Sequence, residues 1–226
     1  MAETIVISLG GSLIVPEEID IDFLKAFRSL IVSQVKKGKK FLIITGGGKI
    51  ARKYQSASRE LVNPTNEDLD WVGIACCSLN AEFLRVIFGD LAHSKVIFNF
   101  SVPFFSDKPV IIGAAYKPGR SSDWDAILGA KLFNSKRAIN LSNTDYIYDS
   151  DPKTNPNAKK IEAIAWKDYR AMIPKEWNAG LNTPFDPIAS ELAEKEGISV
   201  VTMNGKSIEN LNKCLNGEKF LGSTIS

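Results

Sequence analysis

The sequence predicts an α/β fold in which a parallel or mostly parallel sheet carries helices on both faces. Two observations support this prediction. Short apolar runs, such as residues 5–9 and 41–44, have the composition of strands that are buried on both faces. Between such runs, apolar residues recur at helical spacing, and this alternation continues through the last third of the chain. The 226 residues are enough for one large domain or two small lobes.

The expected elements can be placed in order along the chain. Phe23, Leu24, Phe27, Leu30 and Ile31 recur with the period of an amphipathic helix between the first two strands. Further strands are expected at 96–98, 110–112, 138–141 and 199–203. Further helices are expected after 48 and at about 68–88, 123–133, 188–195 and 208–215. The polar, turn-rich segment 148–160 is expected to form a long surface loop.

Composition excludes several classes of protein. With 44% hydrophobic residues, 24% charged residues and a net charge of +2, the chain has no global field that would indicate nucleic-acid binding. No apolar run approaches the ~20 residues of a membrane span, and the start MAETIVISLGGS lacks the shape of a signal peptide. The three cysteines, of which Cys76 and Cys77 are adjacent, do not suggest a disulfide framework. We therefore expect a cytoplasmic protein without a membrane or nucleic-acid partner.

Three glycine-containing turns follow expected strands. They are Gly10-Gly11-Ser12, Gly46-Gly47-Gly48 and the segment 118–123, PGRSSD. Glycine lets backbone N–H groups approach an anion, and a following helix adds its positive end. A single such turn is more often only a tight connection, but three of them at strand carboxyl ends favour an anion site, because ligands bind at that edge of open α/β sheets. None fits the G-x-x-x-x-G-K-[ST] or G-x-G-x-x-G patterns, so the sequence supports neither a P-loop nucleotidase nor a Rossmann dehydrogenase.

Two further groups of residues are candidates for ligand contacts. Arg52 is expected about one turn into the helix after the glycine triplet, where a guanidinium can bind a phosphate bidentately. The alternative is a solvated arginine on an exposed helix face. The turn after 138–141 contains Asn143, Tyr148 and Asp151, which suit stacking on a base and hydrogen bonding to a ribose. The alternative is an ordinary capped loop, since Asn, Asp and Pro are common turn formers.

Taken together, these segments resemble the amino-acid-kinase family, and within it the UMP kinases of the archaeal type. The resemblance runs from about Ile5 to Gly205 and is carried by ISLGGS, TGGGKIARKY, DWVGIACCSLNA, KPGRSSDWDA, NTDYIYDSDPKTNPNAKKI and FDPIASELAEKEGISVVTMNG. The GGGKIARKY segment, together with Asp70, Gly73, Asn80 and Ala81, favours that branch. The family fold is a three-layer α/β/α sandwich, so the resemblance implies one domain over residues 1–226.

The resemblance also implies an activity, the transfer of phosphate from ATP to UMP in pyrimidine biosynthesis, with Mg²⁺ as cofactor and no residue that ligates the metal directly. The acceptor would bind the part at about 1–135 and ATP the part at about 136–226. Catalytic positions would be Gly10, Gly11, Arg52 and Asp123. UMP would contact Gly46, Gly47, Arg52, Asp70, Gly119, Arg120, Ser121 and Ser122. ATP would contact Ser8, Gly10, Gly11, Ser12, Ser142, Asn143, Tyr148 and Asp151. A homo-oligomer, a hexamer in related enzymes, is expected.

The sequence departs from the family pattern in three places. Ser8 stands where many members carry a lysine, so the missing charge would come from Arg52, Lys49, Lys117 or Lys153. Gly113-Ala114-Ala115 replaces a stretch of glycines and threonine, and Tyr146 replaces a glycine. These departures leave two alternatives open: another acceptor, such as an isoprenoid monophosphate, a carbamate or an amino acid, and a non-catalytic binder of nucleotides or anions. Isopentenyl phosphate kinases use a histidine near the acceptor phosphate, and His93 stands apart from the acceptor motifs.

Overall fold

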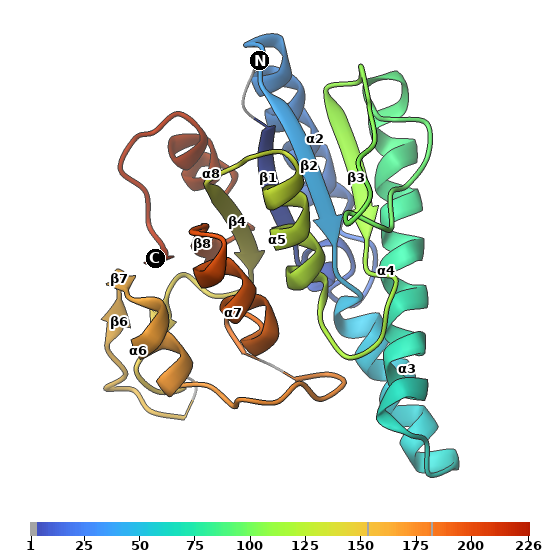
Figure 1. Ribbon diagram of the computed structural model, residues 1–226, viewed down its shortest axis with the longest axis vertical. Coiled ribbons are helices and arrows are strands. Elements are labelled where there is room, and N and C mark those ends of the chain that lie inside the picture. The colour runs from blue at the N-terminus through green and yellow to red at the C-terminus, as the bar shows by residue number, and fades with distance from the viewer. Residues whose placement is uncertain (1–3, 153, 182) are drawn as a thin grey trace.

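The computed structural model describes residues 4–152, 154–181 and 183–226. Within these residues a seven-stranded sheet has the order β3-β2-β1-β4-β8-β9-β7 (Figure 1). The strands are β1 (Thr4–Leu9), β2 (Lys40–Thr45), β3 (Val110–Ala114), β4 (Arg137–Ser142), β7 (Ala163–Ile164), β8 (Ser199–Asn204) and β9 (Ser223–Ile225). All neighbours pair in parallel except β8 and β9. A separate antiparallel pair joins β5 (Ile147–Tyr148) to β6 (Lys160–Ile161).

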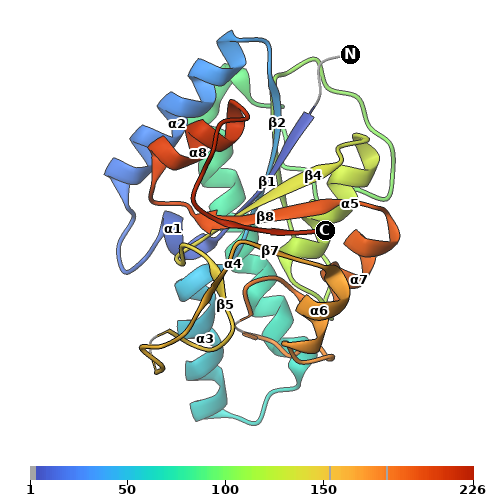
Figure 2. The ribbon, with the colours of Figure 1, turned by 90° about the vertical axis from the view of Figure 1, so that its left-hand side faces the viewer.

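Helices cover both faces of the sheet. Figure 2 shows α2 (Ile21–Lys36) and α8 (Ile208–Leu215) on one side, and α5 (Ser122–Leu132), α6 (Trp166–Ala171) and α7 (Pro187–Lys195) on the other. The remaining helices are α1 (Gly11–Ile14), α3 (Gly48–Leu61), α4 (Asn66–Phe88) and a short 3₁₀ turn at Gly89–Leu91. The expected three-layer α/β/α sandwich is confirmed.

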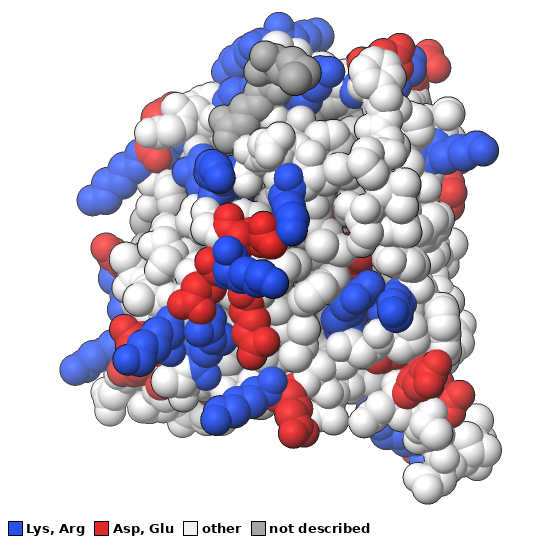
Figure 3. Space-filling model, viewed as in Figure 1, with Lys and Arg blue, Asp and Glu red and all other residues white. Residues whose placement is uncertain are grey.

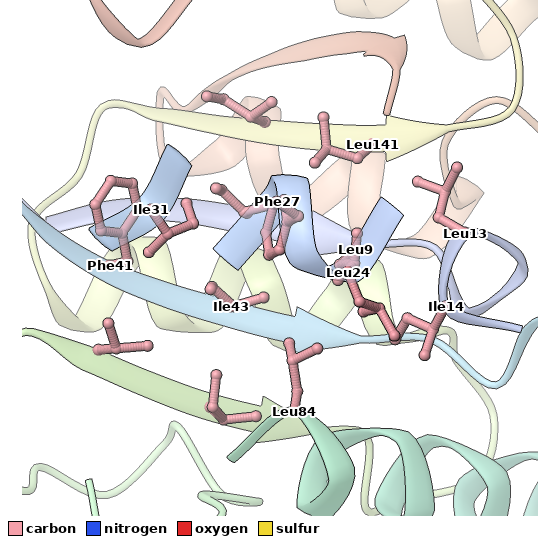
Figure 4. Close-up of a cluster of buried hydrophobic side chains, with 14 of the residues drawn as sticks. Leu9, Leu13, Ile14, Leu24, Phe27, Ile31, Phe41, Ile43, Leu84 and Leu141 are labelled. Atoms are coloured by element: carbon pink, nitrogen blue, oxygen red, sulfur yellow. The ribbon is translucent and has the colours of Figure 1, made fainter. Parts of the chain in front are cut away.

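Alternating side chains on the central strands explain the three layers. On β2, Phe41 and Ile43 belong to the core shared with α2, α4 and α8, whereas Leu42 and Ile44 belong to the core shared with α5, α6 and α7. Because successive side chains of a strand point to opposite faces, an uninterrupted apolar run requires cover on both sides. Figure 4 shows one of these cores, in which Leu24 and Phe27 of α2 pack near Leu9 of β1.

Polar side chains fix where several helices begin. Asp20 accepts a hydrogen bond from the backbone N–H of Phe23 at 3.0 Å and begins α2. Thr65 and Asp68 form a reciprocal capping box at the start of α4. Such caps satisfy N–H groups that have no acceptor within the helix. Similar caps at α5 and α7 involve residues of the candidate site and are described below.

One expected strand was wrong. Residues 96–98 form no strand but only an isolated bridge between Ile97 and Gly113. The chain bends after Ile97 because Phe100 turns into the core, where its ring lies 6.4 Å from that of Phe104. The short elements α1, α6, β5, β6, β7 and β9 were not expected, because they are too short to show periodicity. The three cysteines are free and buried.

Helix α4, with the turn that follows it, has the length and apolar composition of a membrane span. That test is weak, because a core helix of a soluble protein passes it as well. One side of α4 packs on the sheet through Ala81, Leu84 and Phe88. The opposite side exposes Trp71, Leu79 and Val86.

The carboxyl ends of β1 to β4 lie at one edge of the sheet, because these strands run in parallel. At the opposite edge, Lys37, Lys39 and Arg137 line a cavity of about 200 Å³. Figure 3 shows Lys and Arg side chains gathered at the upper end of the molecule and both signs of charge interspersed over the rest of that face. In this view, the lower end of the molecule, toward which β2 and β3 run in Figure 1, carries no large positive surface.

Candidate functional site

The turns after β1 and β2 touch each other through their backbones. A Cβ atom placed on Gly11 would lie 2.2 Å from the carbonyl oxygen of Gly46. One placed on Gly48 would lie 2.3 Å from the backbone of Gly11 and Ser12. Gly48 also has a φ of +66°, which side chains disfavour. The glycines therefore permit a close approach of the two chains, and the structure brings the first two predicted turns into one site.

The N–H groups in these turns have different roles. Gly10 donates to the carbonyl of Leu141 at 3.0 Å, and Gly46 donates to that of Leu9 at 3.0 Å. These bonds hold each turn to the neighbouring strand. Gly11, Ser12 and Gly48 instead open α1 and α3, where the first N–H groups find no acceptor within their own helix. The donors best placed for an anion are thus one or two residues beyond Gly10 and Gly46.

Helix α4 holds the second turn in place through two hydrogen bonds. The side chain of Asn80 donates to the carbonyl of Gly46 at 2.8 Å. Thr45, the last residue of β2, donates its hydroxyl to the carbonyl of Cys77 at 2.9 Å. These bonds fix the direction in which the turn leaves the sheet. Asn80 thus has a structural role, which is to hold the backbone of Gly46 in position.

Arg52 reaches from α3 toward the first turn. Its guanidinium donates to the hydroxyl of Ser12 at 2.9 Å, and the side chain is otherwise exposed. Lys49 does not face the turns, because it pairs with Glu17, as does Lys53 at 3.0 Å. Lys153 lies outside the described residues. Of the candidate cations that the structure describes, Arg52, Lys49 and Lys117, Arg52 is the one with a side-chain hydrogen bond to a residue of the glycine turns.

A network of acidic side chains joins β1, α5 and α7. The hydroxyl of Ser8 donates to Asp123 at 2.8 Å, and the other oxygen of Asp123 accepts the backbone N–H of Asp186 at 3.3 Å. Asp186 caps α7 by accepting from Ala189 at 2.6 Å, and it also accepts from the N–H of Ser121 at 3.2 Å. Ser121 in turn caps α5 through the N–H of Asp123 at 3.1 Å. The network places Asp123 at the end of the central strand.

Burial perturbs the acids in and beside this network. Desolvation, together with the nearby charge of Asp186, raises the pKa of Asp123 to about 6. Desolvation also raises the pKa of Asp186. Asp125 is fully buried, and neither of its carboxyl oxygens has a hydrogen-bond partner within the described residues. Desolvation raises its pKa to about 7, although the charge of Arg120 opposes that rise.

Asp70 joins α4 to the third predicted turn. Its side chain is 8% exposed and accepts the N–H of Gly119 at 2.7 Å. Both of its oxygens also lie 3.2 Å from the indole nitrogen of Trp177. In the same turn, the Arg120 guanidinium lies over the rings of Tyr116 and Trp124, at 5.7 and 5.1 Å. Ser122 begins α5 beside Gly46, since a Cβ on Gly46 would lie 3.4 Å from its hydroxyl.

Four of the residues expected to bind ATP, Ser142, Asn143, Tyr148 and Asp151, lie at or beyond the end of β4, on the other side of β1 from β2. Ser142 ends β4 and accepts the N–H of Thr144 at 3.3 Å, Asn143 and Asp151 are exposed, and Tyr148 lies in β5. The ring of Tyr146 packs at 6.4 Å from that of Tyr148, and Lys160 lies 4.9 Å above it. Tyr146 is thus accommodated in a small aromatic cluster.

Comparison with known proteins agrees with this geometry. The model of the amino acid kinase family matches residues 3–204. The chain belongs to the amino acid kinase family. The predicted resemblance is therefore confirmed, and it covers all of the turns described above.

Relatives within the family share the full length of the chain. It is 32% identical to a uridylate kinase of Thermococcus kodakarensis, over 98% of each protein. It is 31% identical to a uridylate kinase of Thermoplasma acidophilum, over 100% of this chain and 97% of that one. The solved structure of a uridylate kinase from Archaeoglobus fulgidus superposes with a TM-score of 0.77 at 26% identity, covering 99% of this chain and 100% of that one.

Sequence reasoning did not single out two residues of the site. Asp186 had a signal, because an Asp-Pro pair before an apolar helix is typical of a helix start. Trp177 had none, because it lies in an irregular segment far along the chain from Asp70. Within the described residues no group of three or more His, Cys, Asp or Glu side chains is arranged to hold a metal ion.

The unpartnered carboxyl of Asp125 gives a stability prediction. Because its pKa is about 7 in the folded chain and near 3.8 when unfolded, ionisation costs folding free energy as the pH rises from about 4 to above 7. One pKa unit corresponds to about 1.4 kcal/mol. Asp125→Asn should therefore stabilise the protein by about 4 kcal/mol at pH 8, with little gain at pH 4.5, measured by urea unfolding.

The matched control for this measurement is Asp107→Asn, which neutralises an exposed acid. It should leave the unfolding free energy nearly unchanged at both pH values. A gain for Asp125→Asn that is equal at pH 4.5 and pH 8 would show that the carboxyl is not a buried charge.

Proposed function

We propose that this protein phosphorylates UMP to UDP with ATP. The contact between the turns after β1 and β2, with Arg52 bridging them through Ser12, is the observation that carries this proposal. It supports a site in which two anionic groups meet at one point. The uridylate kinases that match over the whole length of the chain support UMP as the acceptor and ATP as the donor.

The sheet order supports a division of the site. Strand β1 lies between β2 and β4, so the turn at Gly10 and Gly11 has the Gly46 turn on one side and Ser142 on the other. We assign UMP to the side of Gly46, Gly47 and Asp70, closed by Gly119 to Ser122. We assign ATP to the side of Ser142, Asn143, Tyr148 and Asp151. The transferred phosphoryl group would then pass across Gly10 and Gly11.

Transfer requires that two polyanions approach each other in line. An oxygen of the UMP phosphate attacks the γ-phosphorus of ATP, and the bond from that phosphorus to the β-γ bridging oxygen breaks to leave ADP. The N–H groups of Gly11, Ser12 and Gly48 would hold phosphate oxygens at the meeting point. Arg52 would bind the acceptor phosphate, where a guanidinium makes two parallel charge-assisted hydrogen bonds. Mg²⁺ would arrive with ATP and neutralise part of the charge.

Ser8 and Asp123 have a different task from the lysine that many relatives carry. Ser8 holds no charge, and its hydroxyl is committed to Asp123. Asp123 is itself bonded to the start of α7, and Asp186 accepts two backbone N–H groups. These bonds hold both carboxylates in place, and within the described residues no group of three or more His, Cys, Asp or Glu side chains is arranged to hold a metal ion. We therefore assign Asp123 the role of orienting groups around the transferred phosphoryl, with the metal held through phosphate and water.

The broader setting is proposed on the same basis. We assign the protein to pyrimidine biosynthesis, where UDP would be its product, and to the cytoplasm, whose reducing conditions suit free buried cysteines. A homo-oligomer stays a prediction from the family resemblance. His93 is the residue that would have favoured an isoprenoid acceptor. Its backbone N–H donates to the carbonyl of Val110 at 2.8 Å. It therefore lies at the amino end of β3, at the far edge from the turns.

The acceptor is tested directly by incubating the protein with Mg-ATP and a panel of acceptors and measuring ADP release. UMP should give the highest kcat/KM among UMP, CMP, AMP, isopentenyl phosphate, carbamate and amino acids. Faster release with another acceptor would reassign the substrate. Binding of ATP and UMP by calorimetry without any ADP release would instead identify a non-catalytic binder.

Asp123→Asn tests the transfer site. If the carboxylate acts on the transition state, kcat should fall by about 10² or more while ligand affinities change little. Because the pKa of Asp123 is about 6, wild-type kcat should rise as the pH increases through 6 and level off above it. The acceptor phosphate also titrates near pH 6, so the variant is compared over the same range to separate the two groups.

Asp22→Asn is the control, because Asp22 is likewise an acid in the first turn of a helix, but an exposed one in α2. It should leave kcat unchanged. If Asp123→Asn only lowers the melting temperature and its folded fraction turns over at the wild-type rate, Asp123 is a helix-end acid and the assignment is wrong.

A further inference from the structure

A short segment of the C-terminal part crosses to the helices of the acceptor side. This segment, Trp177–Gly180, is called the strap below and lies between α6 and α7. Figures 1 and 2 show the orange chain in this region running toward α3 and α4. The strap lies against the residues around Asp70, since Trp177 contacts Asp70 directly.

The strap makes three polar contacts, all between 3.2 and 3.4 Å. The indole nitrogen of Trp177 lies 3.2 Å from each oxygen of Asp70. The side chains of Asn66 and Asn178 approach to 3.4 Å, and Arg59 donates to the carbonyl of Ala179 at 3.3 Å. All three lie at or beyond the long end of the hydrogen-bond range, and Asn66 and Asn178 are exposed. Among these three, the contact between Trp177 and Asp70 is the one that ends on a buried carboxylate.

That contact occupies the carboxylate which the proposed function assigns to the ribose of the acceptor. An ionised carboxylate only accepts hydrogen bonds. One oxygen of Asp70 already accepts the N–H of Gly119 at 2.7 Å, and the indole N–H bridges both oxygens. The indole nitrogen is equally far from both oxygens, so it lies in front of the carboxylate, between them. A ribose diol that donates one hydrogen bond to each oxygen would approach the carboxylate from the same direction. The ring and the ribose therefore compete for one carboxylate.

We propose that the strap is a gate over the acceptor site, held shut by Trp177 on Asp70 and released when the acceptor nucleotide takes that carboxylate. This inference rests on the proposed function, because it takes the acceptor to be a ribonucleotide that binds at Asp70. The gate protects a buried charge in the empty enzyme, since a carboxylate that is 8% exposed is costly without donors. It also makes acceptor affinity depend on the cost of breaking the indole bond.

Trp177→Phe removes the indole N–H and keeps an aromatic ring. With no bond to break, UMP should bind about tenfold more tightly by calorimetry, while the affinity for a non-hydrolysable ATP analogue stays the same. Trp71→Phe is the control, because Trp71 is the next residue after Asp70 on α4 but is 50% exposed. It should change neither affinity. Unchanged or weaker UMP binding by Trp177→Phe would overturn the gate.

A second measurement uses the wild-type protein and does not depend on how the variant folds. In the ¹⁵N spectrum, the indole N–H signal of Trp177 should shift and exchange faster with water when UMP is added, and it should not respond to the ATP analogue alone. An indole signal that stays unchanged while UMP is bound and phosphorylated would reject the gate and leave the proposed function standing. If UMP neither binds nor is phosphorylated, both proposals are wrong.

Discussion

The backbone contact between the turns after β1 and β2 is the constraint on which the rest of the site depends. Gly11 and Gly48 bring the chains so close that a single Cβ on either would overlap the other turn. This contact fixes where α1 and α3 begin, and it sets the position from which Arg52 reaches Ser12. Two neighbouring parallel strands thus end at one point, so a donor and an acceptor bound on either side of β1 would meet there.

The acidic network adds a second constraint, because it links the two parts of the chain across that point. Asp123 connects Ser8 on the central strand with the start of α7, and Asp70 connects α4 with the third turn and with Trp177. Carboxylates in such surroundings are costly when charged, as the raised pKa values of Asp123 and Asp125 indicate. Groups with perturbed pKa values often gather at functional sites, and here they lie beside the glycine turns.

Much of this arrangement could be predicted from the sequence, because its signals are local. Apolar runs such as Phe41–Ile44 and the helical spacing from Phe23 to Ile31 predicted the layers, and the glycine turns predicted the functional edge. The partners of Asp70 and Asp123 could not be predicted, since Trp177 and Asp186 meet them only through the tertiary fold. The expected strand at 96–98 was wrong because a local apolar pattern cannot show that Phe100 turns into the core.

The most direct test of the central claim is a crystal structure with UMP and a non-hydrolysable ATP analogue bound together. The account predicts that the UMP phosphate lies within hydrogen-bond distance of Arg52 and of the backbone N–H of Gly48. It also predicts that the terminal phosphate of the analogue faces the UMP phosphate across Gly10 and Gly11, with the adenosine beyond Ser142. A UMP phosphate bound away from the contact of the two turns, or both nucleotides on one side of β1, would contradict it.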